Sequence, residues 1–118
     1  MPTLDGDGWQ LESGVARHAE APDTFEILEE DLRSRLVPGC FAKLIFTLPG
    51  PDGPEVERMW VQITDRTQTA YVGLLDNDPD TPDAPIAAGD RVEFTPDHVI
   101  DALPPADWKP KAGEYEDG

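Results

Sequence analysis

Residues 56–64 read VERMWVQIT, and the alternation of apolar and polar side chains in this stretch decides the fold. Met59, Val61 and Ile63 fall at every second position. Because successive side chains of a strand point to opposite faces of its sheet, these three residues predict one buried face. The residues between them predict the opposite face, which carries Arg58, Trp60, Gln62 and Thr64.

Further strands are predicted on both sides of this one. The stretches CFAKLIFTL (40–48), AYVGLL (70–75) and RVEFT (91–95) are rich in β-formers. PGPDGP (49–54) and DRTQT (65–69) separate them as turns. Four or five short strands joined by tight turns predict a mainly β, α+β fold. We expect a small curled antiparallel sheet that forms a partly open, SH3-like barrel.

One short helix is predicted in LEEDLRSRL (28–36), because Leu28, Leu32 and Leu36 recur every fourth residue and form one apolar stripe. Thr95-Pro96 is expected to begin a single helical turn that carries His98. We therefore expect one globular domain over residues 23–103. Residues 1–22 are expected to form a loose arm with one short strand, and residues 104–118 a disordered acidic, proline-rich tail.

The charge of the chain restricts its partners. The 118 residues contain 25 acidic and nine basic side chains, giving a net charge of −16. Such a surface repels nucleic-acid phosphates and anionic lipids, so we expect no nucleic-acid and no membrane partner. A basic protein partner is compatible with the charge, and plain solubility is the alternative explanation. The acidic, polar N-terminus and the single cysteine, Cys40, favour a cytoplasmic protein without an internal disulfide.

Residues 71–83, YVGLLDNDPDTPD, run from an apolar strand into a loop of alternating acids. Asp76, Asp78 and Asp80 match the start of a calcium loop, but the sixth and twelfth positions are Thr81 and Ala87 instead of Gly and Glu. We therefore expect no metal and no other cofactor. The preferred interpretation is a turn, in which Asp76 or Asn77 binds nearby backbone N–H groups and Pro79 prevents continuation of the strand. Gly73 indicates a bulge or a close contact, with the Trp60 ring as one candidate partner.

Candidate catalytic residues are scarce. The two serines, Ser13 and Ser34, lie outside a nucleophile-elbow motif, and no phosphate-binding glycine motif occurs. Cys40 opens an apolar strand, where a buried and inert thiol is expected, and His98 is expected to be structural. No catalytic residues are therefore predicted. Trp60 among polar neighbours has two interpretations: a binding hot spot, or a second minor core beneath the arm or the helix.

Six short motifs occur in an order that resembles a bacterial family of small domains of unknown function. That family is similar to immunity-protein domains of polymorphic toxin systems. The resemblance covers residues 24–101 and implies a fold more than a mechanism. The motifs are F-x-I (25–27), K-L-I-F (43–46), E-R-M-W-V (57–61), G-x-L-x-N-x-P (73–79), G-D-x-V-x-F (89–94) and H-x-I-D (98–101).

Together these features predict a non-enzymatic, acidic protein-binding module. Its sharpest form is an immunity or inhibitor protein that masks a basic toxin. The alternatives are a regulatory or scaffold domain whose acidity serves solubility, and a small-ligand-binding protein or hydrolase. The sequence leaves the oligomeric state open. The residues expected to contact a protein partner are Arg58, Trp60, Gln62, Asp76, Asn77, Asp78 and Asp80.

Overall fold

A long hairpin forms the centre of the computed structural model, which describes residues 8–21, 27 and 29–104. Strands β2 (Phe41–Gly50) and β3 (Gly53–Arg66) pair antiparallel along their whole length. Both strands run further into the turn cluster at 49–54 than predicted, because Pro49 and Pro54 still oppose each other in the ladder. The turn itself is reduced to Pro51 and Asp52, followed by Gly53 with a φ of +126° that favours glycine.

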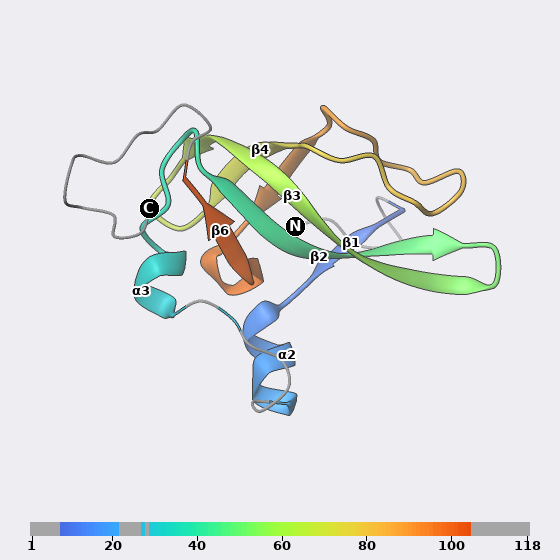
Figure 1. The fold of residues 1–118 in the computed structure, drawn as a ribbon, viewed down its shortest axis with the longest axis horizontal. Coiled ribbons are helices and arrows are strands. Elements are labelled where there is room, and N and C mark those ends of the chain that lie inside the picture. Colours follow the sequence, from blue (N-terminus) through green and yellow to red (C-terminus); the bar gives the residue numbers. More distant parts are fainter. Residues whose placement is uncertain (1–7, 22–26, 28, 105–118) are drawn as a thin grey trace, which may run out of the picture.

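The sheet continues antiparallel on both sides of this hairpin. The strand order is β1-β2-β3-β4-β5, and β6 pairs with β2 at Phe41–Lys43 on the same edge as β1. Figure 1 shows the sheet curling into a half-barrel, with the hairpin tip projecting to one side. The predicted fold class, mainly β with a curled antiparallel sheet, is confirmed. The remaining strands are β1 (Gln10–Glu12), β4 (Tyr71–Leu75), β5 (Arg91–Phe94) and β6 (Asp101–Leu103).

The core fills the concave side of the sheet. Met59, Val61 and Ile63 are buried there, as the alternation in 56–64 predicts. Burial of this apolar surface is the main favourable term in folding, at roughly 25 cal/mol per Å². Neighbouring strands and loops contribute the other fully buried members: Ala42, Leu44, Phe46, Leu48, Tyr71, Leu75, Ile86, Val92, Phe94 and Val99.

Gly73 marks a close approach between β3 and β4. A Cβ at this position would lie 2.4 Å from the carbonyl oxygen of Gln62 and 2.6 Å from a methyl group of Val61. The close contact predicted for Gly73 is therefore present, but the suggested partner, the Trp60 ring, was wrong. A bulge lies nearby, because the register between β3 and β4 shifts between Ile63 and Asp65.

The predicted helix over 28–36 is wrong in extent and in orientation. The structure places α3 at Glu30–Arg33 only. Leu32 is 52% exposed, whereas Arg33 is buried. Arg33 can lie inside because its guanidinium donates to the Pro96 carbonyl at 3.1 Å and pairs with Asp97 at 3.8 Å. Leu28 lies outside the described residues.

Two side chains of the sheet bind the carbonyls at the C-terminal end of α3. Tyr71 donates its hydroxyl proton to the Arg33 carbonyl at 2.7 Å. Arg66 donates to the carbonyls of Ser34 and Leu36, both at 2.6 Å. These bonds satisfy carbonyls at and after the end of the helix that no following helical turn pairs.

The residues expected to form a loose N-terminal arm include regular structure. β1 pairs with β2, and helix α2 (Gly14–Glu20) follows, with the Ser13 hydroxyl accepting from the Ala16 N–H at 3.0 Å. Both α2 and α3 contact the 3₁₀ helix η1 (Pro96–His98), which the sequence predicted as a helical turn. No helix in the described ranges has the length and apolar character needed to cross a membrane. The predicted tail falls outside them, except for Pro104.

Candidate functional site

Trp60 lies on the outer, convex face of the sheet. It alternates with the buried Met59 and Val61 of β3 and is itself half-buried. Its cross-strand partner on β2 is Lys43, whose ammonium group lies 5.6 Å from the centre of the indole ring. This geometry is a cation–π contact, which favours a fixed position of both side chains.

A row of side chains crosses the same face beside Trp60. Consecutive cross-strand pairs join Leu103 of β6, Phe41 of β2, Gln62 of β3 and Leu74 of β4. Leu103 is 50% exposed and Leu74 41% exposed, so the ends of the row remain open to a partner. We call the outer-face residues Phe41, Lys43, Arg58, Trp60, Gln62, Leu74 and Leu103 the Trp60 face.

The structure brings the three predicted strand residues together on this face. Arg58 opposes Ile45 in the ladder, on the outer side, and Gln62 follows Trp60 two residues on. Arg58 is exposed, while Gln62 is half-buried. Cover on this outer face is uneven: Ile45, opposite Arg58, is only 1% exposed, Trp60 is half-buried, and Leu74 is 41% exposed.

The acid–proline loop (76–90) is attached directly to the Trp60 backbone. Asn77 accepts the Trp60 N–H through Oδ1 at 2.7 Å, and the Asp76 N–H donates to the Trp60 carbonyl at 2.9 Å. The predicted role of Asn77 as a strand terminator is therefore confirmed. Two further acids also bind the backbone: Asp78 accepts from the Ala88 N–H at 3.1 Å, and Asp90 from the Ala87 N–H at 2.9 Å.

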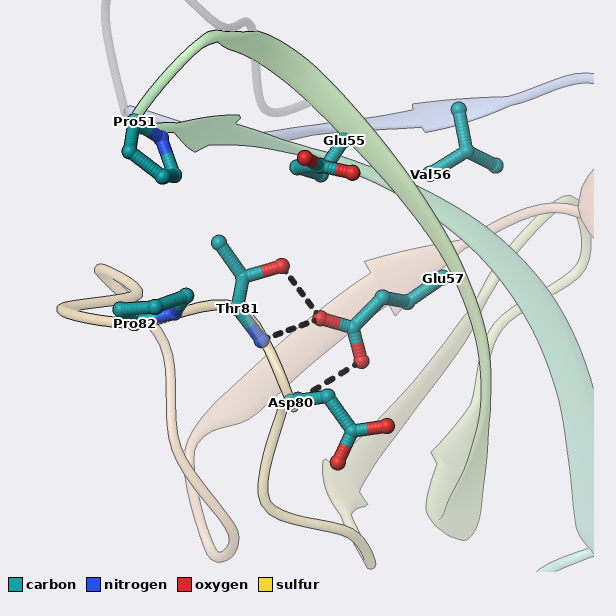
Figure 2. A pocket seen from close by; sticks show the side chains of 7 residues that line it. All are labelled: Pro51, Glu55, Val56, Glu57, Asp80, Thr81 and Pro82. Atoms are coloured by element: carbon teal, nitrogen blue, oxygen red, sulfur yellow. Dashed lines mark hydrogen bonds between the residues drawn. The ribbon is translucent and has the colours of Figure 1, made fainter.

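Glu57 holds the middle of this loop, and the sequence interpretation missed it (Figure 2). Its carboxylate accepts from the Asp80 N–H at 2.9 Å, the Thr81 N–H at 2.8 Å and the Thr81 hydroxyl. Burial raises the pKa of this carboxyl group, but these three hydrogen bonds outweigh burial and hold the pKa below its usual value. A sequence signal existed, because Glu57 occupies the apolar phase of the strand, in register with Met59 and opposite Phe46.

Between the hairpin and this loop lies a cavity of about 360 Å³ with acidic and proline walls. Glu55 and Asp80 are exposed at this cavity, and Pro51 and Pro82 form opposite sides of it (Figure 2). The carboxylates of Glu55 and Asp80 make the walls of this cavity negatively charged. The Glu57 carboxylate, by contrast, is occupied by the loop and serves to position it. Asp78, Asp80 and Asp90 are all exposed, but the carboxylates of Asp78 and Asp90 accept backbone N–H groups, whereas Asp80 contributes its own N–H to Glu57.

A second, apolar cavity of about 280 Å³ lies between α3 and β6. The sequence did not indicate it, because β6 was not predicted and Leu32 was expected to be buried. Cys40, expected to be a buried and inert thiol, is half-buried at the wall of this cavity. We call this cavity the α3–β6 groove; it is lined by Leu32, Arg35, Leu36, Cys40, Ala102, Leu103 and Pro104.

His98 is structural, as predicted. Its Nδ1 accepts the Thr95 N–H at 3.0 Å, and the two residues form a capping box at the start of η1. Burial lowers the pKa of the His98 imidazole, which the neighbouring Asp97 opposes. Burial and the hydrogen bond that Nδ1 accepts both favour the neutral imidazole.

No protein-family model, no curated protein and no solved structure matches the chain.

Proposed function

We propose that this chain is a non-enzymatic protein-binding module whose Trp60 face binds a basic surface of another protein. The observation that carries the proposal is the position of Trp60, half-buried on an outer sheet face that is open at Leu74 and Leu103. Tryptophan and arginine are enriched at the energetic centres of interfaces, and this face presents Trp60 beside Arg58. An apolar centre with a polar border is the usual anatomy of an interface.

Charge supports a basic partner. The chain has a net charge of −16, and acids border the face directly. Asp101 opposes Lys43 in the ladder, and Asp76 binds the Trp60 carbonyl through its backbone N–H. Both are exposed. Such a field speeds encounter with a cationic surface and penalises an acidic one.

The resemblance to immunity-protein domains supports a sharper form of the proposal. In this form the chain is an inhibitor that covers the cationic active site of a toxin. A rigid acidic loop suits this role, because the loop between Asn77 and Asp90 is already held by Glu57, Asp78 and Asp90. A surface that is ordered before binding loses less conformational entropy on association.

The test is capture of partners from the native host on the immobilised full chain, followed by affinity measurements with variants. Leu74→Asp places a charge on the exposed end of the Trp60 face, and we expect it to weaken binding about tenfold or more. Val15→Asp is the matched control, because Val15 is 36% exposed on α2 and is not a residue of the Trp60 face. Equal affinities of the two variants for the captured partner would refute the Trp60 face as the binding site.

A further inference from the structure

We infer that the α3–β6 groove receives one apolar side chain of the same basic partner and acts as its anchor pocket. This inference rests on the proposed function and extends it to a second, structurally different feature. It starts from the groove lining, which is apolar apart from Arg35. Leu32 and Leu103, on opposite sides of the groove, are 52% and 50% exposed.

The size of the groove selects the kind of occupant. Its volume of about 280 Å³ lies below the roughly 300–1,000 Å³ of pockets that enclose whole small molecules. It also lacks the convergent polar groups that orient such ligands, since Arg35 already pairs with Asp31 at 3.2 Å. A single leucine-, methionine- or phenylalanine-like side chain of a protein fits these properties best.

The groove is continuous with the Trp60 face. Leu103 lines the groove and is also the first residue of the outer-face row that leads through Phe41 to Gln62. A partner seated on the Trp60 face can therefore reach the groove without leaving the surface. Apolar anchors that fill pockets beside a central aromatic residue are the usual source of binding energy.

Charge around the groove selects a basic segment rather than a second copy of this chain. Glu29, Glu30 and Asp31 are exposed at and before α3, and Asp101 is exposed on β6. A second copy would bring another net charge of −16 against these acids. An apolar side chain flanked by lysine or arginine complements both the groove and its border.

Cys40, the single cysteine of the chain, reports occupancy of the groove directly. The probe is a synthetic peptide whose leucines lie on one helical face between lysines. The readout is the rate at which iodoacetamide, an uncharged reagent, alkylates Cys40 at about 0.15 M salt, where long-range charge effects are screened. With peptide at about ten times its Kd, we expect alkylation to slow about tenfold, because only the free fraction reacts.

Two control peptides separate anchoring from charge. A peptide with every leucine replaced by serine is expected to give no protection, and one with every lysine replaced by glutamate none either. Protection by the serine peptide, or absence of protection by the leucine–lysine peptide, would overturn the inference. Trp108 follows the groove residue Pro104 by four positions in the sequence. Faster alkylation of Cys40 in unliganded Trp108→Ser would also overturn the inference, because the groove would then be filled by the chain itself. Concentration-dependent self-association that protects Cys40 would assign the groove to a second copy.

Exposed-residue variants keep the test independent of folding. Leu32→Asp is expected to weaken the leucine–lysine peptide about tenfold or more, whereas Val56→Asp should leave it unchanged. Val56 is the matched control, because it is 50% exposed on β3 and does not line the groove. With the captured partner, loss of affinity for Leu74→Asp but not for Leu32→Asp would refute the anchor pocket and leave the proposed function intact. The reverse pattern would refute the Trp60 face alone.

Discussion

Asn77 accepts the backbone N–H of Trp60 at 2.7 Å, and this contact joins the acid–proline loop to the strand that carries the candidate binding residue. The position of the loop is therefore coupled to the position of Trp60. We expect Asn77→Ala to destabilise the fold by about 1–3 kcal/mol, because it leaves a half-buried donor without its acceptor. Asn77→Asp, which keeps an acceptor oxygen, should retain most of the stability. Urea denaturation checks the difference, and equal losses in both variants would contradict the role of this hydrogen bond.

The second prediction concerns strand register. Val61 is fully buried in the core, whereas its neighbour Gln62 lies on the outer face. Val61→Asp buries an unpaired carboxyl group, at a cost of several kcal/mol. That cost is a large part of a typical stability of roughly 5–15 kcal/mol. Thermal melts should show loss of cooperative unfolding for Val61→Asp and a normal transition for Gln62→Asp. Similar melts for both would mean that the register is wrong.

The third prediction follows from Glu57. Its pKa in the folded protein lies below its ordinary value of 4.5, so the folded state binds this proton less tightly than the unfolded chain does. The stabilisation from the ionised carboxylate is present above the unfolded pKa and is lost as pH falls through the folded pKa. We expect Glu57→Gln to reduce stability at neutral pH and to flatten its decline below about pH 4.5. Denaturant titrations across this range measure it; an unchanged acid slope would exclude Glu57 as a contributor.

The fourth prediction concerns His98, whose folded-state pKa is also lowered, here chiefly by burial. For a histidine the sign means that the folded state resists protonation. Stability is therefore full above the unfolded pKa of about 6.5 and declines as pH falls from there towards the folded pKa. Acid also removes the acceptor for the Thr95 N–H. His98→Asn should lose this pH dependence in thermal melts below about pH 6.5, and an unchanged pH dependence would contradict the role of His98.

The sequence predicted the parts of the fold that depend on local alternation. Met59, Val61 and Ile63 reveal their common face without any knowledge of the partner strand. β6 and the inward position of Arg33 depend instead on contacts between distant segments. Arg33 is buried only because Pro96, 63 residues away, supplies its acceptor. Helix α2 had a local signal in the Ser13 cap, which the sequence interpretation did not use.

Some residues of the candidate site were likewise predictable from local sequence, and others depend on contacts between distant segments. Trp60 stood out because a large aromatic residue alternated with polar ones, and Asn77 because it followed a strand. The sequence could not show which of the exposed loop acids bind backbone N–H groups through their carboxylates. Asp78 reaches Ala88 only because the loop folds back on itself. One wall of the α3–β6 groove is formed by β6, which is distant in sequence from Cys40 and was not predicted. The residues around Cys40 alone therefore could not indicate the groove.

The last prediction concerns the exposed loop acids and their effect on the rate of association with the partner. Asp80 and Asp83 are exposed, whereas Asp78 holds the Ala88 N–H and is left unchanged. Asp80→Asn and Asp83→Asn together should preserve the loop, and asparagine tolerates the φ of 54° found at Asp83. We expect the double variant to slow association with the captured partner and to weaken its dependence on salt, because border charges act mainly on encounter. Dissociation should change little.

Trp60→Ala, once shown to fold, should instead speed dissociation and reduce the free energy of binding by about 2 kcal/mol or more. Surface plasmon resonance at several ionic strengths separates the two effects. A salt-independent association rate, together with full affinity of the Trp60→Ala variant, would contradict the acidic binding module and favour a scaffold whose charge serves solubility.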